Sequence, residues 1–250
     1  MNRDIKIFKT PSELAEKLAE ELVLRINDSA KKKKALTIAL SGGSTPELLL
    51  SKLGDDYSKS VAWEYVQIFW VDERCVPPDN IESNYKMVNE KLLRKIDIPL
   101  CNVHRIRGER TPEKEALGYS EEISEFTRSS RGFPAFDIIL LGVGDDGHTA
   151  SIFPGNLELL TTDKICKVAV HPVTGQKRIT VTGKVINNSQ LIYFLVTGIK
   201  KSEIVSRILN DPEASQSFPA SHIVSVSGIV NWYIDEEAGR LYNMKSVVKD

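Results

Sequence analysis

Short apolar runs alternate with amphipathic helical patterns along almost the whole chain, and this alternation constrains the fold more than any other feature. The clearest runs, each five or six residues long, lie at residues 36–40, 66–71, 136–141 and 191–196. They are short and apolar with many β-branched residues, which is typical of buried strands. The sequence therefore predicts a largely parallel sheet that is covered by helices on both faces.

Caps and apolar stripes mark the helical segments. Thr10 is placed to cap a helix that has Pro11 at its first position and Glu13 at its third. Apolar residues then recur every four positions and form one stripe, at Leu14, Leu18, Leu22 and Ile26. Further helices are predicted at residues 47–53, 83–93, 112–128, 200–209 and 235–241.

Size and composition narrow the class of protein. The 250 residues suffice for one large domain, and no repeat or linker divides residues 1–250. A formal net charge of -1 gives no bulk attraction to nucleic acid or to an anionic membrane. No stretch has the length of a membrane span or a signal-peptide core, and three scattered cysteines fit reduced thiols. We expect a cytoplasmic monomer.

The segment 136–154, FDIILLGVGDDGHTASIFP, joins an apolar run to a cluster of polar side chains. Glycines directly after the run let the backbone turn sharply and approach a ligand. Asp145, Asp146 and His148 then follow the carboxyl end of a strand, where ligands bind in open α/β sheets. A histidine beside carboxylates at such an edge is a candidate acid–base centre.

The same segment contains the G-x-G-x-x-G pattern of dinucleotide-binding proteins, at residues 142–147. That fingerprint needs a long helix after its third glycine, whereas Pro154 and Gly155 interrupt the chain within two helical turns. It also needs an acidic residue after the next strand, but the candidate strand at 166–170 is followed by histidine and proline. We therefore expect no nicotinamide cofactor.

The loop at residues 41–46, SGGSTP, joins a predicted strand to a predicted helix. Its glycines expose backbone N–H groups, and Ser44 and Thr45 add hydroxyls. At a helix N-terminus such groups form an anion site, and the phosphate of a small molecule is the natural ligand. The alternative is a tight strand–helix turn capped by one of the hydroxyls.

Charged residues lie at the ends of three other strands. Asp72 and Arg74 close the strand at 66–71, and an arginine there can hold phosphate with two hydrogen bonds. Arg178 precedes a short candidate strand, and Lys200 and Lys201 follow the strand at 191–196. No second histidine has metal-ligand spacing to His148, so no metal site is predicted.

Taken together, four segments resemble the 6-phosphogluconolactonase family, which is related in fold to glucosamine-6-phosphate isomerase/deaminase. They are SGGSTP at 41–46, VDERCVPPDNIESN at 71–84, LGVGDDGHTASIFP at 141–154 and TGIKK at 197–201. The resemblance covers residues 35–241. It implies a three-layer α/β/α fold with a mostly parallel, Rossmann-like sheet. It also implies hydrolysis of 6-phospho-D-glucono-1,5-lactone to 6-phosphogluconate, in the oxidative pentose phosphate pathway, without a cofactor.

The resemblance also suggests roles for individual residues. The phosphate loop corresponds to Gly42, Gly43, Ser44 and Thr45, and Arg74 and Lys201 match phosphate-contacting residues. His148 matches the catalytic histidine, which we expect to act as a general base on water, and either Asp72 or Asp146 orients its ring. Arg178 matches the arginine of a Pro-Arg-x-Thr pattern, although Lys177 replaces the proline. Either Arg178 or backbone N–H groups stabilise the oxyanion.

Two alternatives remain open. A hexosamine-phosphate isomerase/deaminase shares the fold but carries a glutamate at the fifth position after the histidine, where this chain has Phe153. A non-catalytic sugar-phosphate sensor would lack the histidine, and His148 is present.

Overall fold

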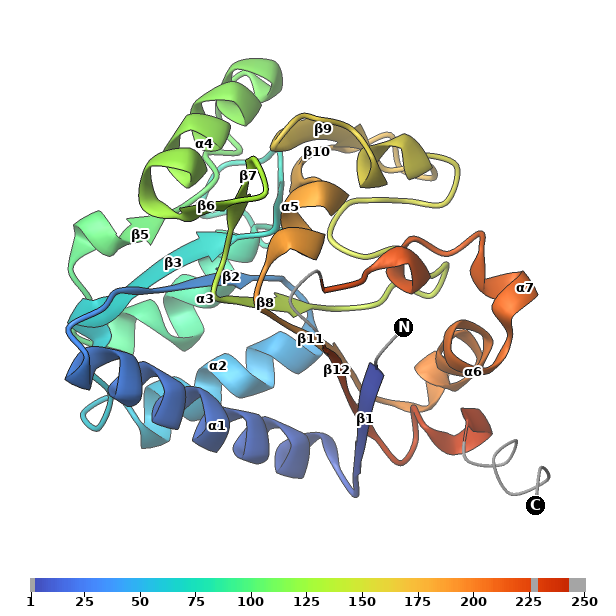
Figure 1. Ribbon diagram of the computed structural model, residues 1–250, viewed down its shortest axis with the longest axis horizontal. Helices are drawn as coiled ribbons and strands as arrows, with labels where there is room; N and C mark the ends of the chain where they lie inside the picture. The colour runs from blue at the N-terminus through green and yellow to red at the C-terminus, as the bar shows by residue number, and fades with distance from the viewer. Residues whose placement is uncertain (1–2, 226–228, 243–250) are drawn as a thin grey trace.

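A seven-stranded, fully parallel sheet runs through the centre of the computed structural model, which describes residues 3–225 and 229–242 (Figure 1). Its strand order is β1-β12-β11-β8-β2-β3-β5. These strands are β1 Arg3–Phe8, β2 Leu36–Leu40, β3 Val66–Trp70, β5 Val103–His104, β8 Ile138–Leu141, β11 Leu191–Val196 and β12 Val230–Asp235.

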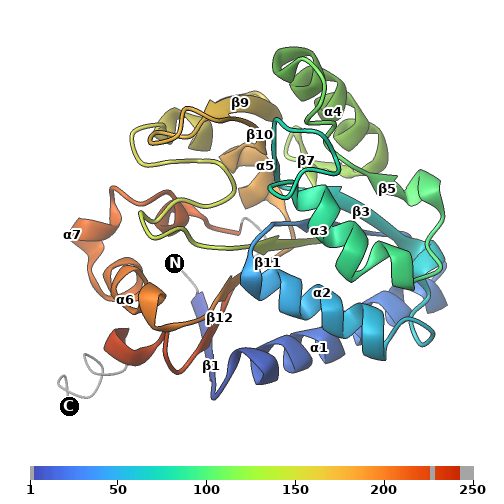
Figure 2. The ribbon, with the colours of Figure 1, turned by 180° about the vertical axis from the view of Figure 1, so that it is seen from behind.

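Helices cover both faces of this sheet, which confirms the predicted α/β/α layers. Helices α1, α2 and α3 lie on one face, and α4 and α5 lie on the other (Figures 1 and 2). The helices are α1 Pro11–Lys31, α2 Ser44–Asp56, α3 Asn84–Lys91, α4 Pro112–Phe126, α5 Gly183–Asn188, α6 Ser202–Asn210 and α7 Pro212–Ser215. Short 3-10 turns are η1 Trp63–Tyr65, η2 Leu93–Lys95, η3 Leu100–Asn102, η4 Leu157–Leu160, η5 Ile199–Lys201 and η6 Pro219–His222. None of the described helices is long and apolar enough to cross a membrane.

Most helices lie close to the positions that local sequence patterns predicted. Thr10 caps α1, since its hydroxyl accepts a hydrogen bond of 3.1 Å from the Glu13 amide. Helix α2 begins at Ser44, three residues before the predicted start. The helix predicted at 235–241 begins five residues later, because Asp235 ends β12, residues 236–239 form a turn and, of the described residues there, only 240–242 are helical. Strand β12 pairs with both β1 and β11, and this tertiary pairing overrides the local helical pattern.

The strand order reverses between β2 and β8. From β2 the chain continues outward through β3 to β5, whereas from β8 it continues through β11 to β12. At such a reversal the following connections diverge to opposite faces and leave a crevice at the carboxyl ends of the strands. The loops after β2 and β8 are the two loops that the sequence analysis singled out, so the fold brings them together.

Side chains hold this junction at both ends. At the amino end, the Asp137 carboxylate accepts hydrogen bonds of 2.9 Å from both the backbone amide and the hydroxyl of Thr37. At the carboxyl end, the Ser41 hydroxyl donates to the Leu140 carbonyl at 2.8 Å. The backbones of β2 and β8 pair at only two residue positions. The side-chain hydrogen bonds therefore add contacts between the two strands beyond this short backbone pairing.

A small antiparallel sheet lies beside the carboxyl edge of the large one. It contains β4 Asp72–Arg74, β10 Lys177–Val181 and β9 Cys166–Val170, in that order. Strand β4 continues from β3 through Val71, whose carbonyl accepts from the Val181 amide at 2.7 Å. The register places Arg178 directly opposite Arg74. A separate hairpin is formed by β6 Arg128–Ser130 and β7 Phe133–Ala135.

We predict that Asp137→Ala lowers the free energy of unfolding by about 1–3 kcal/mol, because the buried Thr37 amide loses its acceptor. Chemical denaturation of the purified variant measures this loss. Asp163→Ala is the matched control, since Asp163 pairs with Lys184 at the surface, where removal of an ion pair costs about 0–1 kcal/mol. Equal losses in the two variants would contradict the role given to Asp137.

Candidate active site

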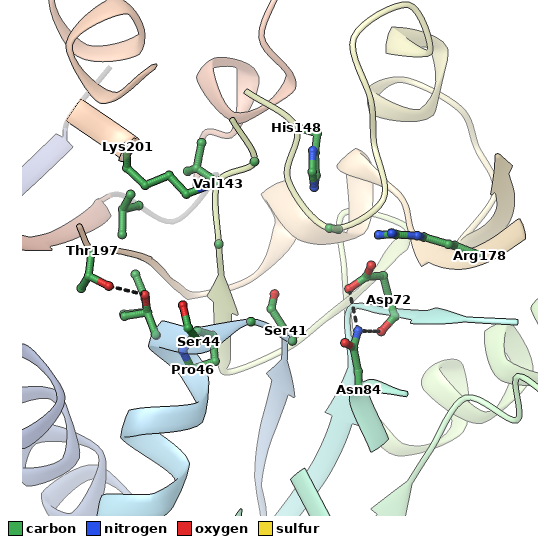
Figure 3. A pocket seen from close by; sticks show the side chains of 18 of the residues that line it. Ser41, Ser44, Pro46, Asp72, Asn84, Val143, His148, Arg178, Thr197 and Lys201 are labelled. Atoms are coloured by element: carbon green, nitrogen blue, oxygen red, sulfur yellow. Dashed lines mark hydrogen bonds between the residues drawn. The ribbon is translucent and has the colours of Figure 1, made fainter. Parts of the chain in front are cut away.

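One pocket of about 260 Å³ opens at the carboxyl edge of the large sheet (Figure 3). Loops after β2, β3, β8 and β11 form its walls together with β10. Nine of the ten predicted site residues line it, and the tenth, Asp146, contacts one of them. The lining residues are Ser41, Gly42, Gly43, Ser44, Thr45, Pro46, Asp72, Arg74, Asn84, Gly142, Val143, Gly144, His148, Ala150, Arg178, Leu195, Val196, Thr197 and Lys201.

The loop at residues 41–46 forms the floor of the pocket (Figure 3). Helix α2 starts within this loop, so its N-terminal backbone amides and the positive end of its dipole face the cavity. The Thr45 hydroxyl lies 2.7 Å from the Thr197 hydroxyl, which ties the loop to the end of β11. A side chain at Gly42 would lie 1.9 Å from Oδ1 of Asn84, so the loop packs directly on that residue.

His148 and Asp146 form a hydrogen-bonded pair above this floor. Nδ1 of the imidazole lies 2.6 Å from Oδ1 of Asp146. Burial alone would raise the pKa of Asp146, but the hydrogen bonds and the charge of His148 outweigh it, so this pKa lies below its ordinary value. An ionised Asp146 accepts the Nδ1 proton and leaves Nε2 as a basic nitrogen. Of the two candidate carboxylates, it is therefore Asp146 that hydrogen-bonds the imidazole, whereas Asp72 accepts from Ser151 and Asn84.

A glycine makes room for this pair. A Cβ atom at Gly144 would lie 2.0 Å from Nδ1 of His148 and 2.7 Å from Oδ1 of Asp146. On the other side, the Phe153 ring packs against the imidazole at a centroid distance of 4.9 Å. Contacts on both sides restrict the orientation of the imidazole.

Phe153 also contacts the ring of a second histidine, His171. The His171 ring lies 5.1 Å from the Phe153 ring, and Nδ1 of His171 accepts from the amides of Val173 and Thr174. Burial and the positive charge of Arg178 lower the pKa of His171. The sequence analysis treated His171 only as the residue after a candidate strand, and no local signal connects it with His148.

Arg74 and Arg178 form one cationic wall. They are cross-strand partners, an arrangement in which like charges normally destabilise a sheet. Nε of each guanidinium is buried without a hydrogen-bond partner among the described residues. Unsatisfied N–H groups beside an open pocket favour an anionic ligand that would accept from them. The sequence indicated each arginine separately, but only the register of β4 and β10 brings them together.

Two carboxylates, those of Asp72 and Glu73, lie close enough for their charges to act on Arg178. Asp72 accepts from the Ser151 hydroxyl at 2.6 Å. Its carboxylate lies next to Arg178 (Figure 3), and its charge opposes the lowering of the Arg178 pKa by burial. Glu73 is turned away from the pocket and accepts from the amides at the start of α3, at 2.8 Å from Asn84 and 2.7 Å from Tyr85. Burial raises the pKa of Glu73, although these hydrogen bonds oppose the shift.

The lysine wall lies on the opposite side of the pocket. Figure 3 shows Lys201 and Arg178 far apart, with His148 between them. Lys201 lines the cavity and Lys200 does not. The sequence analysis also missed Asn84, which lines the pocket and donates to the Asp72 carbonyl at 2.9 Å. The polar end of the segment 71–84 could have indicated Asn84 from the sequence, because Ser83 caps a helix there and Asn84 is its first residue.

This arrangement combines an anion-binding floor, two cationic walls and one histidine whose Nε2 has no hydrogen-bond partner among the described residues. It suits acid–base chemistry on a small phosphorylated molecule. Within residues 3–225 and 229–242, no group of three or more His, Cys, Asp or Glu side chains is placed to hold a metal ion.

Comparison with known proteins identifies the family. Residues 9–232 match the family model of glucosamine-6-phosphate isomerases/6-phosphogluconolactonase, so the chain belongs to this family. A 6-phosphogluconolactonase of Treponema pallidum is 43% identical over 86% of this chain and 89% of its own length. A 6-phosphogluconolactonase of Haemophilus influenzae is 38% identical over 94% of this chain and 97% of its own.

Solved structures agree with this relationship. A protein called devB superposes with a TM-score of 0.90 at 39% identity, over 95% of this chain and 98% of its own. The 6-phosphogluconolactonase of Trypanosoma brucei gives a TM-score of 0.84 at 30% identity over the same shares of the two chains. A monomeric glucosamine-6-phosphate deaminase, at 22% identity and a TM-score of 0.76, shares the fold.

We predict that the His148 imidazole carries its proton on Nδ1 when neutral, because Nδ1 faces the Asp146 carboxylate. Long-range ¹⁵N–¹H NMR of the imidazole reports this tautomer directly. Gly144→Ala should abolish that spectral pattern, since its Cβ would displace both partners. Gly118→Ala is the control, because a Cβ there meets nothing within 4 Å, and it should leave the pattern unchanged. A neutral His148 protonated on Nε2 in the wild type would contradict this geometry.

Proposed function

We propose that this protein hydrolyses 6-phospho-D-glucono-1,5-lactone to 6-phosphogluconate, as a step of the oxidative pentose phosphate pathway. The observation that carries the proposal is the His148–Asp146 pair, which faces a pocket lined by cationic groups. The relatives named 6-phosphogluconolactonase support it, since two of them match most of this chain at 43% and 38% identity. The family match over residues 9–232 supports a single lactonase domain.

His148 acts as the general base in this proposal. A lactone is an activated ester, so the reaction requires only a nucleophilic water and stabilisation of the developing charge. Nε2 of His148 removes a proton from water as its oxygen attacks C1 of the lactone. The resulting tetrahedral intermediate carries a negative oxygen. When the C1–ring oxygen bond breaks, the imidazolium returns the proton to the departing ring oxygen and a carboxylic acid forms at C1. This acid then loses its proton to solvent, which gives the carboxylate product.

Arg178 is our proposed partner for the oxyanion. Its guanidinium lies in the wall beside His148, and its Nε–H, which has no hydrogen-bond partner among the described residues, can donate to a new acceptor. Asp72 positions Arg178 through its negative charge rather than by contact with the histidine. Hydrogen-bond donors fixed in this way stabilise charge in the transition state without reorganisation.

The phosphate occupies the floor at residues 42–45, with Arg74 and Lys201 as cationic partners. Backbone amides at the start of α2 supply hydrogen bonds, and the two side chains supply charge. This binding energy holds C1 of the lactone near His148 and the attacking water.

We predict turnover of the lactone and no release of ammonia from glucosamine 6-phosphate. The residue five positions after His148 is Phe153, which cannot transfer a proton as the deaminases' glutamate would. Lactone generated in situ should disappear faster with the protein than without it. Ammonia release at a rate comparable with lactone turnover would overturn the proposed function in favour of a deaminase, and no activity on either compound would favour a sensor.

We predict that His148→Ala lowers kcat by about 10²–10⁴-fold, the usual contribution of a positioned base. Asp146→Asn should cause a loss on the order of 10²–10⁴-fold, because a carboxamide can donate to Nδ1 and reverse the tautomer. Steady-state kinetics of folded variants measure both effects. His222→Ala, remote from the pocket lining, should retain the wild-type kcat. A folded His148→Ala variant with normal turnover would remove the histidine from the mechanism.

A further inference from the structure

The lysine proposed to bind phosphate is already held by a carboxylate of the protein. Nζ of Lys201 donates to Oδ1 of Asp145 at 2.6 Å. The Lys201 side chain extends toward the loop that carries Val143 (Figure 3). Asp145 is two residues beyond Val143 in that loop and directly precedes Asp146. The ion pair therefore connects the lysine wall with the loop that contains the catalytic pair.

Exposure makes this ion pair easy to displace. The Asp145 side chain is 78% exposed, whereas that of Lys201 is 26% exposed. Exposed ion pairs contribute only about 0–1 kcal/mol, because water solvates both charges well. A ligand phosphate that also contacts the amides of the pocket floor can thus replace the Asp145 carboxylate on Lys201. Buried groups of the pocket, such as Asp72, cannot be displaced into solvent in this way.

We propose that Asp145 competes with the substrate phosphate for Lys201 and thereby sets the affinity for phosphorylated ligands. This inference rests on the proposed function, since it requires Lys201 to bind the phosphate. While Asp145 holds the ammonium, Lys201 offers a phosphate little net charge. A bound phosphate releases Asp145 into solvent beside His148, and the freed carboxylate then favours departure of the anionic product. Asp145 therefore weakens the binding of phosphorylated ligands and shortens the residence time of the product.

Calorimetric titration of the full-length protein with 6-phosphogluconate tests this competition. Asp145→Asn keeps the size of the side chain and removes its charge. It should lower Kd for 6-phosphogluconate by about two- to fivefold, the range expected for loss of an exposed ion pair. Asp163→Asn, which breaks the exposed Asp163–Lys184 pair away from the pocket lining, is the matched control and should leave Kd unchanged. A gain in affinity cannot arise from structural damage.

A double-mutant cycle with Lys201→Ala separates competition for the lysine from general charge repulsion. When Lys201 is already alanine, Asp145→Asn should change Kd by less than it does in the otherwise wild-type protein. An equal gain in both backgrounds would overturn the competition, since repulsion alone would then account for it. Binding by the wild type with no gain in Asp145→Asn would overturn this inference and leave the proposed function intact. Absence of 6-phosphogluconate binding to the wild type would overturn both.

Discussion

The pairing of β2 with β8 is the constraint on which the rest of the structure depends. The parallel sheet reverses direction at this junction, so the loops that follow the two strands meet at one edge and enclose a pocket. One loop starts α2 and supplies an anion-binding floor, and the other supplies the histidine. Thr37, Asp137 and Ser41 hold the junction through side-chain hydrogen bonds at both ends. A displacement of β2 relative to β8 would separate the pocket floor from His148.

Several charged side chains around the pocket lie close together. Some of them carry like charges that repel each other, and others depend on these neighbours for a partner. Arg74 and Arg178 face each other across two strands, and Asp72 lies buried beside them with Ser151 as a hydrogen-bond donor. Such a cluster is unfavourable unless an anion joins it, because buried charges need partners. Lys201 is likewise paired with a carboxylate, that of Asp145, although this ion pair is exposed. The pocket is thus built for a phosphorylated or otherwise anionic molecule.

The sequence predicted those features that local patterns encode. Strands at 36–40 and 191–196 agree with the structure because short apolar runs need burial, and the two glycine-rich loops were found because they follow such runs. Features that depend on pairing between distant segments were missed. β12 was not predicted as a strand and its last residue was assigned to a helix. Asn84 and His171 are positioned by contacts with residues remote in the sequence, and the Asp145–Lys201 pair spans two such loops.

The central claim is that one ligand reaches from the pocket floor to His148. A crystal structure of the protein with 6-phosphogluconate tests this most directly, because the product carries both ends of the proposed substrate. We expect the phosphate on the amides of residues 42–45, and the C1 carboxylate within about 3–4 Å of Nε2 of His148, close enough for a shared water or a direct hydrogen bond. A phosphate bound elsewhere, or a C1 carboxylate directed away from His148, would contradict it.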